Sequence, residues 1–130
     1  MHLQESGEMY LETILILSEK SPFVRSVDVA DYMHFSKPSI SRAVNLLKDN
    51  GYLNVGADGG LTLTDAGREV AETIYERHRV LTAMLIALGV DPEIAAEDAC
   101  KMEHDISNET FAAIKAHAER FNPTAAGKDA

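Results

Sequence analysis

Residues 36–63 read SKPSISRAVNLLKDNGYLNVGADGGLTL and contain the clearest secondary-structure signals of the chain. Ser36 is a favourable helix N-cap, and Pro38 is tolerated in the first turn of a helix. The apolar residues that follow at helical spacing predict a buried stripe: Ile40, Val44 and Leu47. Asn50-Gly51 is a common helix end. The stretch therefore begins with a helix of about four turns.

A β-hairpin is predicted directly after this helix. Residues 52–55 and 61–63 alternate between apolar and polar side chains, and the glycine-rich segment 56–60 separates them. Ser26 and Thr64 are expected to cap two further helices. Apolar residues at helical spacing predict helices over residues 3–19, 26–33, 65–88, 92–105 and 108–121. Three helices followed by a hairpin are the element order of a winged helix-turn-helix.

The sequence thus predicts a mainly α protein with a winged helix-turn-helix over residues 1–70 and an all-helical lobe over residues 71–122. Residues 123–130 follow Asn122 and are expected to form a disordered tail. The lobe holds more large apolar residues than so small a unit can bury alone: Met84, Leu85, Leu88, Phe111 and Phe121. We therefore expect this lobe to form the interface of a homodimer.

The helix after Ser36 is the expected DNA-reading element, because a recognition helix presents its N-terminal end to base edges in the major groove. Arg42 can bind a guanine through two hydrogen bonds, and Pro38 can contact a thymine methyl group. Serine hydroxyls suit base edges or phosphates, and nearby basic side chains suit phosphates. The expected DNA-binding set is Arg25, Ser36, Lys37, Pro38, Ser39, Ser41, Arg42 and Lys48.

The net charge of −9 argues against DNA binding, because phosphates repel an acidic chain. Much of the acidic charge lies outside the DNA-reading segment, and bound divalent cations would offset part of it. Two other functions stay open: a metal-independent winged-helix regulator with an organic ligand, and a winged-helix module that binds proteins. An enzyme is not expected, since the sequence has no His-Glu-x-x-His motif and no evident nucleophile–base pair.

No secretory or membrane-spanning segment is expected. The first residues are mostly polar, and the longest apolar run, residues 80–90, is too short to cross a bilayer. The single cysteine excludes an internal disulfide and fits a reducing compartment. We therefore expect a cytoplasmic protein that does not bind membranes.

Metal-ligating side chains form three groups in the expected helices. The groups are Met9 with Glu12, His78 alone, and Cys100 with Glu103 and His104. Residues three and four apart share one side of a helix, so each group can face one ion. A lone methionine or cysteine in a helix usually packs in the core, but sulfur, imidazole and carboxylate together suit a mid-to-late first-row divalent ion.

Five motifs occur in order: Glu8-Met9-Tyr10-Leu11-Glu12, Ser36-Lys37-Pro38-Ser39-Ile40-Ser41, Leu63-Thr64-Asp65-Ala66-Gly67, His78-Arg79 and Cys100-Lys101-Met102-Glu103-His104. Together they resemble the diphtheria-toxin-repressor and manganese-transport-regulator family over residues 7–121. The resemblance implies a prokaryotic homodimeric repressor that binds palindromic operators in double-stranded DNA when loaded with Fe²⁺ or Mn²⁺. Such repressors usually control metal uptake.

The ligand set combines features of both branches of that family. The residues that resemble the primary site of the iron-responsive branch are Met9, Cys100, Glu103 and His104. Glu12 and His78 instead match positions in the binuclear site of the manganese branch. Thr82 and Ala96 stand where the second iron-branch site has Glu and His, and the SH3-like domain of that branch is not expected. The resemblance favours Fe²⁺ as the co-repressor, with Mn²⁺ as the alternative.

Overall fold

The computed structural model describes residues 5–121 and divides the chain into two compact units, one up to Glu72 and one from Thr73 onward. The expected tail, residues 123–130, lies outside the described residues. The elements in order are α1 (Glu5–Lys20), α2 (Ser26–Met33), α3 (Lys37–Asp49), β1 (Leu53–Val55), β2 (Leu61–Leu63), α4 (Asp65–Ala87), α5 (Pro92–Met102) and α6 (Asn108–Phe121).

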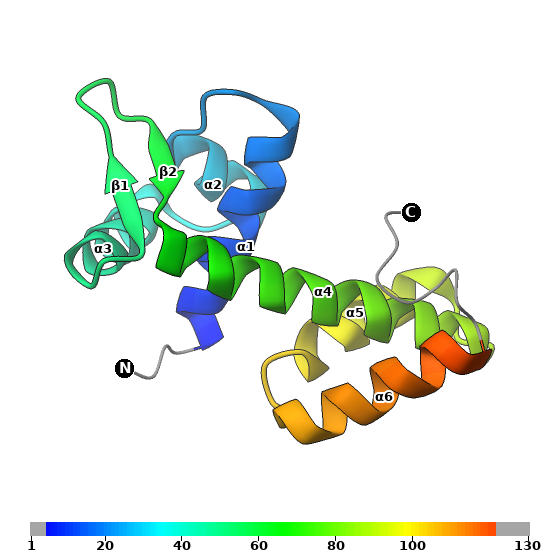
Figure 1. The fold of residues 1–130 in the computed structure, drawn as a ribbon. Coiled ribbons are helices and arrows are strands. Elements are labelled where there is room, and N and C mark those ends of the chain that lie inside the picture. Colours follow the sequence, from blue (N-terminus) through cyan, green and yellow to red (C-terminus); the bar gives the residue numbers. More distant parts are fainter. Residues whose placement is uncertain (1–4, 122–130) are drawn as a thin grey trace. The chain divides into compact units, whose positions relative to one another are not determined.

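The first unit is a winged helix-turn-helix. Helices α1, α2 and α3 pack on one another, and the hairpin of β1 and β2 lies beside them (Figure 1). The strands are antiparallel, with Leu53 opposite Leu63 and Val55 opposite Leu61. The core of this unit includes Leu11, Ile14, Val29, Ile40, Val44, Leu47, Leu53 and Leu61. The predicted stripe on the recognition helix is therefore confirmed as the buried face of α3.

The ends of α3 form as their residues predict. The Ser36 hydroxyl accepts a hydrogen bond from the backbone N–H of Ser39 at 3.2 Å, which caps the helix. Gly51 follows the helix with a φ of +84°, a conformation that glycine adopts without steric cost. The chain can therefore turn directly from α3 into the hairpin.

The hairpin is tied to the start of α4 through Thr64. Its hydroxyl accepts a hydrogen bond from the backbone N–H of Gly67 at 3.1 Å and donates one to the carbonyl of Gly51 at 2.7 Å. Gly67 lies so close to Tyr52 that a Cβ would overlap the Tyr52 carbonyl. The Thr64 hydroxyl and the missing side chain of Gly67 thus allow the first turn of α4 to pack against the end of α3.

Three helix ends and one helix cap differ from those expected. Helix α1 ends at Lys20, one residue later than predicted. Helix α2 begins at Ser26 with Arg25 as its N-cap, because the Asp28 carboxylate accepts a hydrogen bond from the Arg25 N–H at 2.9 Å. Helix α4 ends at Ala87, and α5 ends at Met102, before the predicted limit of residue 105. The early end of α5 matters because it falls within the third group of expected ligands.

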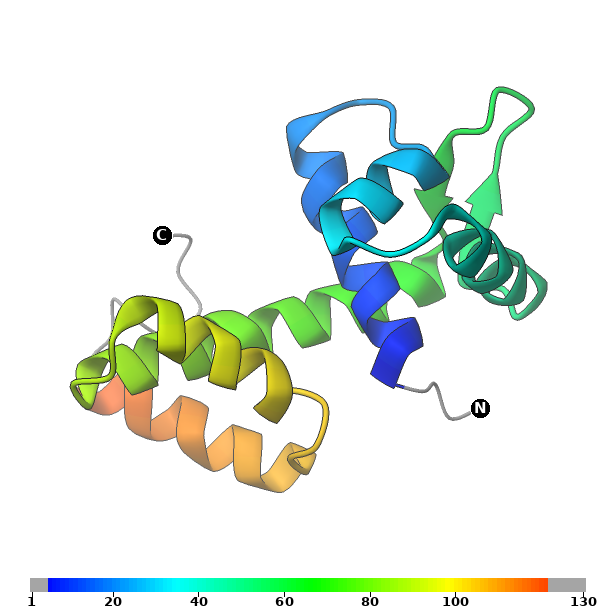
Figure 2. The ribbon, with the colours of Figure 1, turned by 180° about the vertical axis from the view of Figure 1, so that it is seen from behind.

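The second unit contains most of α4 together with α5 and α6, which lie beside it (Figure 2). Lys115 of α6 donates a hydrogen bond to Glu76 of α4 at 2.7 Å. Phe111 is buried within this unit, so it is not available to a second subunit as expected. The large apolar side chains that remain exposed here are Ile86, Leu88 and Ile94. None of the described helices combines the length and apolar character that crossing a membrane requires.

Candidate metal centre and nucleic-acid interface

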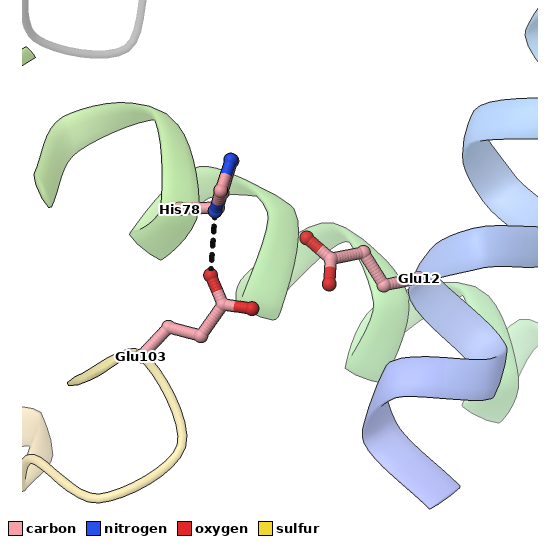
Figure 3. Close-up of side chains that lie close together, drawn as sticks. All are labelled: Glu12, His78 and Glu103. Atoms are coloured by element: carbon pink, nitrogen blue, oxygen red, sulfur yellow. Dashed lines mark hydrogen bonds and ion pairs between the residues drawn. The ribbon is translucent and has the colours of Figure 1, made fainter. Parts of the chain in front are cut away.

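A hydrogen-bonded pair, His78 with Glu103, joins α4 to the end of α5 within the second unit (Figure 3). The Nδ1 atom of His78 lies 3.0 Å from Oε2 of Glu103. Glu103 is fully buried, whereas the side chain of His78 is 28% exposed. A buried carboxylate needs a partner, and an imidazole supplies a hydrogen bond and, when protonated, a positive charge.

His104 lies beside the other oxygen of the same carboxylate. Its Nε2 atom lies 3.4 Å from Oε1 of Glu103, and this buried oxygen accepts no hydrogen bond of good geometry from any residue that the structure describes. Burial by itself raises the pKa of Glu103, but the two neighbouring imidazoles, His104 at Oε1 and His78 at Oε2, outweigh it and hold that pKa below its usual value. The carboxylate is therefore kept ionised between two imidazoles.

The expected ligands of the third group do not all lie on a helix. Cys100 is a half-buried residue of α5, but Glu103 is the C-cap of that helix and His104 lies in the turn that follows. The backbone of Glu103 keeps helical angles (φ −61°, ψ −25°), and its N–H still donates to the carbonyl of Ala99. The turn after α5, and not helical spacing alone, therefore directs His104 toward Glu103.

Arg77 holds this turn, a role that the sequence pattern did not predict. The guanidinium donates hydrogen bonds to the carbonyls of Glu103 (3.0 Å) and Ile106 (2.8 Å) and to Oδ1 of Asn108 (2.6 Å). Its guanidinium carbon Cζ also lies 5.4 Å from the centroid of the Phe111 ring. One signal was present in the sequence: Arg77 continues the buried stripe of Ala71, Ile74 and Leu81 on α4, where a charged residue is unusual.

The remaining expected ligands, Met9 and Glu12, belong to the first unit. Both are residues of α1, Met9 half-buried and Glu12 buried, and the side chain of Glu12 extends from that helix (Figure 3). Their spacing of three places them on one side of α1. The structure thus brings three of the six expected ligands together within one unit: His78, Glu103 and His104.

These donors fit a divalent cation. A buried carboxylate oxygen that accepts no hydrogen bond would gain a partner from a cation, and imidazoles ligate metals in their neutral form. His78 on α4 and Glu103 at the end of α5 supply imidazole and carboxylate donors, with Cys100 on α5 as a candidate thiolate. Such a mixture of nitrogen, oxygen and sulfur donors is typical of Fe²⁺, Co²⁺, Ni²⁺ or Zn²⁺ sites.

The expected DNA-reading end of α3 lies on the surface. Ser36, Lys37, Pro38, Ser41 and Arg42 are exposed. Ser39 is half-buried; its hydroxyl lies 2.8 Å from that of Ser36 and 3.4 Å from Nη2 of Arg42. The start of the helix therefore presents hydroxyls and one guanidinium together, on a face opposite the buried stripe.

The two other basic residues of the expected DNA-binding set are also exposed. Lys48 lies in the last turn of α3, and Arg25 precedes α2. The Nε atom of Arg25 lies 3.8 Å from Oδ2 of Asp28, at a side-chain exposure of 54% for Arg25. A pair so exposed contributes little energy, so Arg25 can exchange Asp28 for a phosphate.

The family of this chain follows from two domain matches. Residues 2–61 match the N-terminal DNA-binding domain of the iron-dependent repressors. Residues 64–128 match the metal-binding and dimerisation domain of the same family. The chain belongs to the iron-dependent repressor family. The resemblance found in the sequence, the mainly helical fold with an N-terminal helix-turn-helix, and the expectation of a regulator instead of an enzyme are thereby confirmed.

Relatives of similar length share most of the chain. It is 31% identical over 121 residues to an uncharacterised HTH-type transcriptional regulator of Methanocaldococcus jannaschii, covering 92% of this chain and 97% of that protein. It is 33% identical over 124 residues to the transcriptional regulator MntR of Salmonella typhimurium, covering 95% of this chain and 79% of MntR.

Several solved structures that resemble this chain come from longer proteins. The structure of the manganese regulator SloR matches with a TM-score of 0.78 and 25% identity, covering 92% of this chain and 55% of SloR. The chain therefore spans about half the length of that structure. Family members bind operator DNA and dimerise, and these are the two partners expected from the sequence.

Proposed function

We propose that this protein is a cytoplasmic, homodimeric repressor that binds a palindromic operator when it holds Fe²⁺, with Mn²⁺ as the alternative, and that it controls metal-uptake genes. The observation that carries the proposal is the fully buried carboxylate of Glu103. It lies between His78 and His104, and within residues 5–121 no group donates a well-aligned hydrogen bond to one of its oxygens. Membership of the iron-dependent repressor family supports the same reading.

The proposed ligands are Met9, Glu12, His78, Cys100, Glu103 and His104. The first two belong to α1 of the first unit, and the other four belong to the second unit. Ligands from both units would share the metal, and the bound metal would supply a cross-link between them. Without that link, the DNA-binding and dimerisation parts, proposed as residues 1–70 and 71–122, would be free to vary in their angle.

This link would control DNA binding through geometry. Two recognition helices of a dimer must lie about 34 Å apart to enter half-sites one helical turn from each other. Fixing the angle between the two parts selects that separation. A coupling free energy of roughly 1–3 kcal/mol, or about 5–150-fold in operator affinity, is typical of such linkage.

The preference for Fe²⁺ rests on the sulfur donors. The thiolate of Cys100 and the thioether of Met9 are soft ligands, which disfavour Mn²⁺ relative to later first-row ions. Glu12 adds a hard oxygen donor, which favours the binding of Mn²⁺. The named comparisons include both metals, since the matched family is iron-dependent and SloR is a manganese regulator.

An anaerobic titration of the metal-free protein with Fe²⁺ and, separately, Mn²⁺ tests the choice of metal. Tighter Fe²⁺ binding with one ion per subunit supports the iron proposal. If Mn²⁺ binds as tightly as Fe²⁺ or more tightly, with two ions per subunit, the co-repressor is Mn²⁺ instead. Absence of specific binding of either ion would overturn the metal-dependent function.

The ligand assignment is tested with Glu103→Ala and His104→Ala. Each variant should lose the metal dependence of operator binding while the dimer stays folded. His117→Ala is a matched control, because His117 is an exposed residue of α6 outside the proposed set. The assignment is wrong if both ligand variants still bind operator in a metal-dependent way.

We further propose that the exposed end of α3 contacts the operator. Ser36, Lys37, Pro38, Ser39, Ser41 and Arg42 would contact bases or adjacent phosphates, and Arg25 and Lys48 would contact phosphates. Arg42 beside the hydroxyl of Ser39 suits a guanine edge. Basic residues are few, so binding by one subunit should be weak and the dimer should be needed for tight binding.

A further inference from the structure

Arg77 is a charged side chain in a position where protein cores usually have an apolar one. Only 7% of the residue is exposed, and no carboxylate pairs with it among residues 5–121. Its acceptors are two backbone carbonyls and the side-chain amide of Asn108. Burying a guanidinium is unfavourable unless it is hydrogen-bonded, and here Nη1 and Nη2 are bonded while Nε has no partner among the described residues.

The carbonyls that Arg77 binds belong to the turn between α5 and α6. The last carbonyls of a helix have no partner within that helix, and they carry the negative end of its dipole. Glu103 ends α5 and contributes one of these carbonyls. Ile106, in the same turn, contributes the other. The guanidinium therefore donates hydrogen bonds to two carbonyls that have no backbone partner. The partial negative charge at the end of α5 in turn stabilises the positive charge of Arg77.

We propose that Arg77 is a positioning residue for the metal site, holding the turn that carries Glu103 and His104 in the geometry needed for binding. This inference rests on the proposed function. Other bonds within the turn are backbone bonds to the carbonyl of Met102, from Asp105 at 3.1 Å and Ile106 at 3.3 Å. These leave the carbonyls of Glu103 and Ile106 to Arg77.

An arginine suits this role better than a lysine. The planar guanidinium directs several N–H groups in fixed directions, so one side chain can set three acceptors relative to one another. The side chain is itself held by the Phe111 ring beneath it. Because His78 is the next residue of α4, the element that presents one ligand also fixes the turn that presents two others.

The test compares Co²⁺ binding and the visible absorption of the Co²⁺-loaded protein, whose bands report the number and geometry of ligands. The variants are Arg77→Met, Arg77→Lys and, as a matched control, Lys115→Met. Lys115 also ties α4 to α6, through Glu76, but does not touch the turn. Removing groups that orient metal ligands typically weakens binding by about 10–100-fold.

We expect Arg77→Met to weaken Co²⁺ binding within that range and to change the absorption bands. Arg77→Lys should recover part of the affinity, and Lys115→Met should match the wild type in both readouts. If Arg77→Met does not fold, Asn108→Ala serves in its place. That variant removes one acceptor and leaves both carbonyl bonds, so several-fold weaker Co²⁺ binding is expected.

Each opposing result has a distinct meaning. The positioning role would be overturned if the Arg77 variants bound Co²⁺ with the affinity and absorption bands of the wild type. The same result in both Arg77→Lys and Asn108→Ala would also overturn it, and in either case the proposed metal site would stand. Equal weakening by Lys115→Met would also overturn it, because the effect would then reflect general loosening of the unit. A wild-type protein that binds no Co²⁺, Fe²⁺ or Mn²⁺ would overturn the proposed function and this inference with it.

Discussion

Replacing Thr64 by valine should destabilise the winged helix-turn-helix without altering its shape, because valine has the same branching but no hydroxyl. The hydroxyl makes two bonds, one from the N–H of Gly67 (3.1 Å) and one to the carbonyl of Gly51 (2.7 Å). Loss of a helix N-cap costs about 1 kcal/mol. Loss of the second hydrogen bond costs about 1 kcal/mol more. The expected total is about 2 kcal/mol.

Urea unfolding followed by far-UV circular dichroism measures this loss. With a denaturant dependence of about 2 kcal/mol per molar urea, 2 kcal/mol corresponds to a midpoint lowered by about 1 M. Protein concentration must be the same in every sample, because dimerisation shifts the midpoint. Thr64→Ser is the matched control, since serine keeps the hydroxyl and should stay near the wild type.

Two results would refute this reasoning. A Thr64→Val midpoint equal to that of the wild type would mean that solvent replaces both bonds without loss. An equal loss in Thr64→Ser and Thr64→Val would mean that the methyl group of Thr64 matters and its hydroxyl does not.

Three further outcomes are expected. Arg42→Ala should weaken operator binding by about 1–3 kcal/mol while metal stoichiometry stays unchanged, as fluorescence anisotropy and metal titration would show. Gly67→Ala should cost about 1–3 kcal/mol in urea unfolding, because the added Cβ overlaps the Tyr52 carbonyl; wild-type stability would contradict the close approach. In the metal-free protein the pKa of Glu103 is lower in the folded than in the unfolded state, so the ionised carboxylate stabilises the fold. This stabilisation is complete above the unfolded-state pKa and is lost as the pH falls through the folded-state pKa. Urea midpoints between neutral and acid pH should therefore fall less in Glu103→Gln than in the wild type, and parallel curves would contradict this.

Much of the fold was predictable because it depends on local periodicity. The stripe of Ile40, Val44 and Leu47 can be buried together only on a helix, and these three residues are the buried face of α3. The helix N-cap Ser36 and the positive φ of Gly51 set the two ends of that helix. Such signals need no knowledge of distant residues.

The details that failed depend on competing partners nearby. Ser26 has the right chemistry for an N-cap, yet the carboxylate of Asp28 binds the Arg25 N–H and moves the cap one residue earlier. Phe111 is apolar enough for a dimer interface, but packing on Arg77 buries it within its own unit. Spacing along the chain does not show which of two suitable partners is chosen.

The winged helix-turn-helix, the helical second unit and the candidate ligands could all be predicted from side-chain periodicity and ligand chemistry. The end of α5 at Met102 and the approach of His104 to Glu103 from a turn became visible only in the three-dimensional structure. It also revealed Arg77 as the residue that holds this turn. Arg77 binds backbone carbonyls that lie 26 and 29 residues further along the chain. Every residue has such a carbonyl, so the type of residue does not show which carbonyls Arg77 will bind.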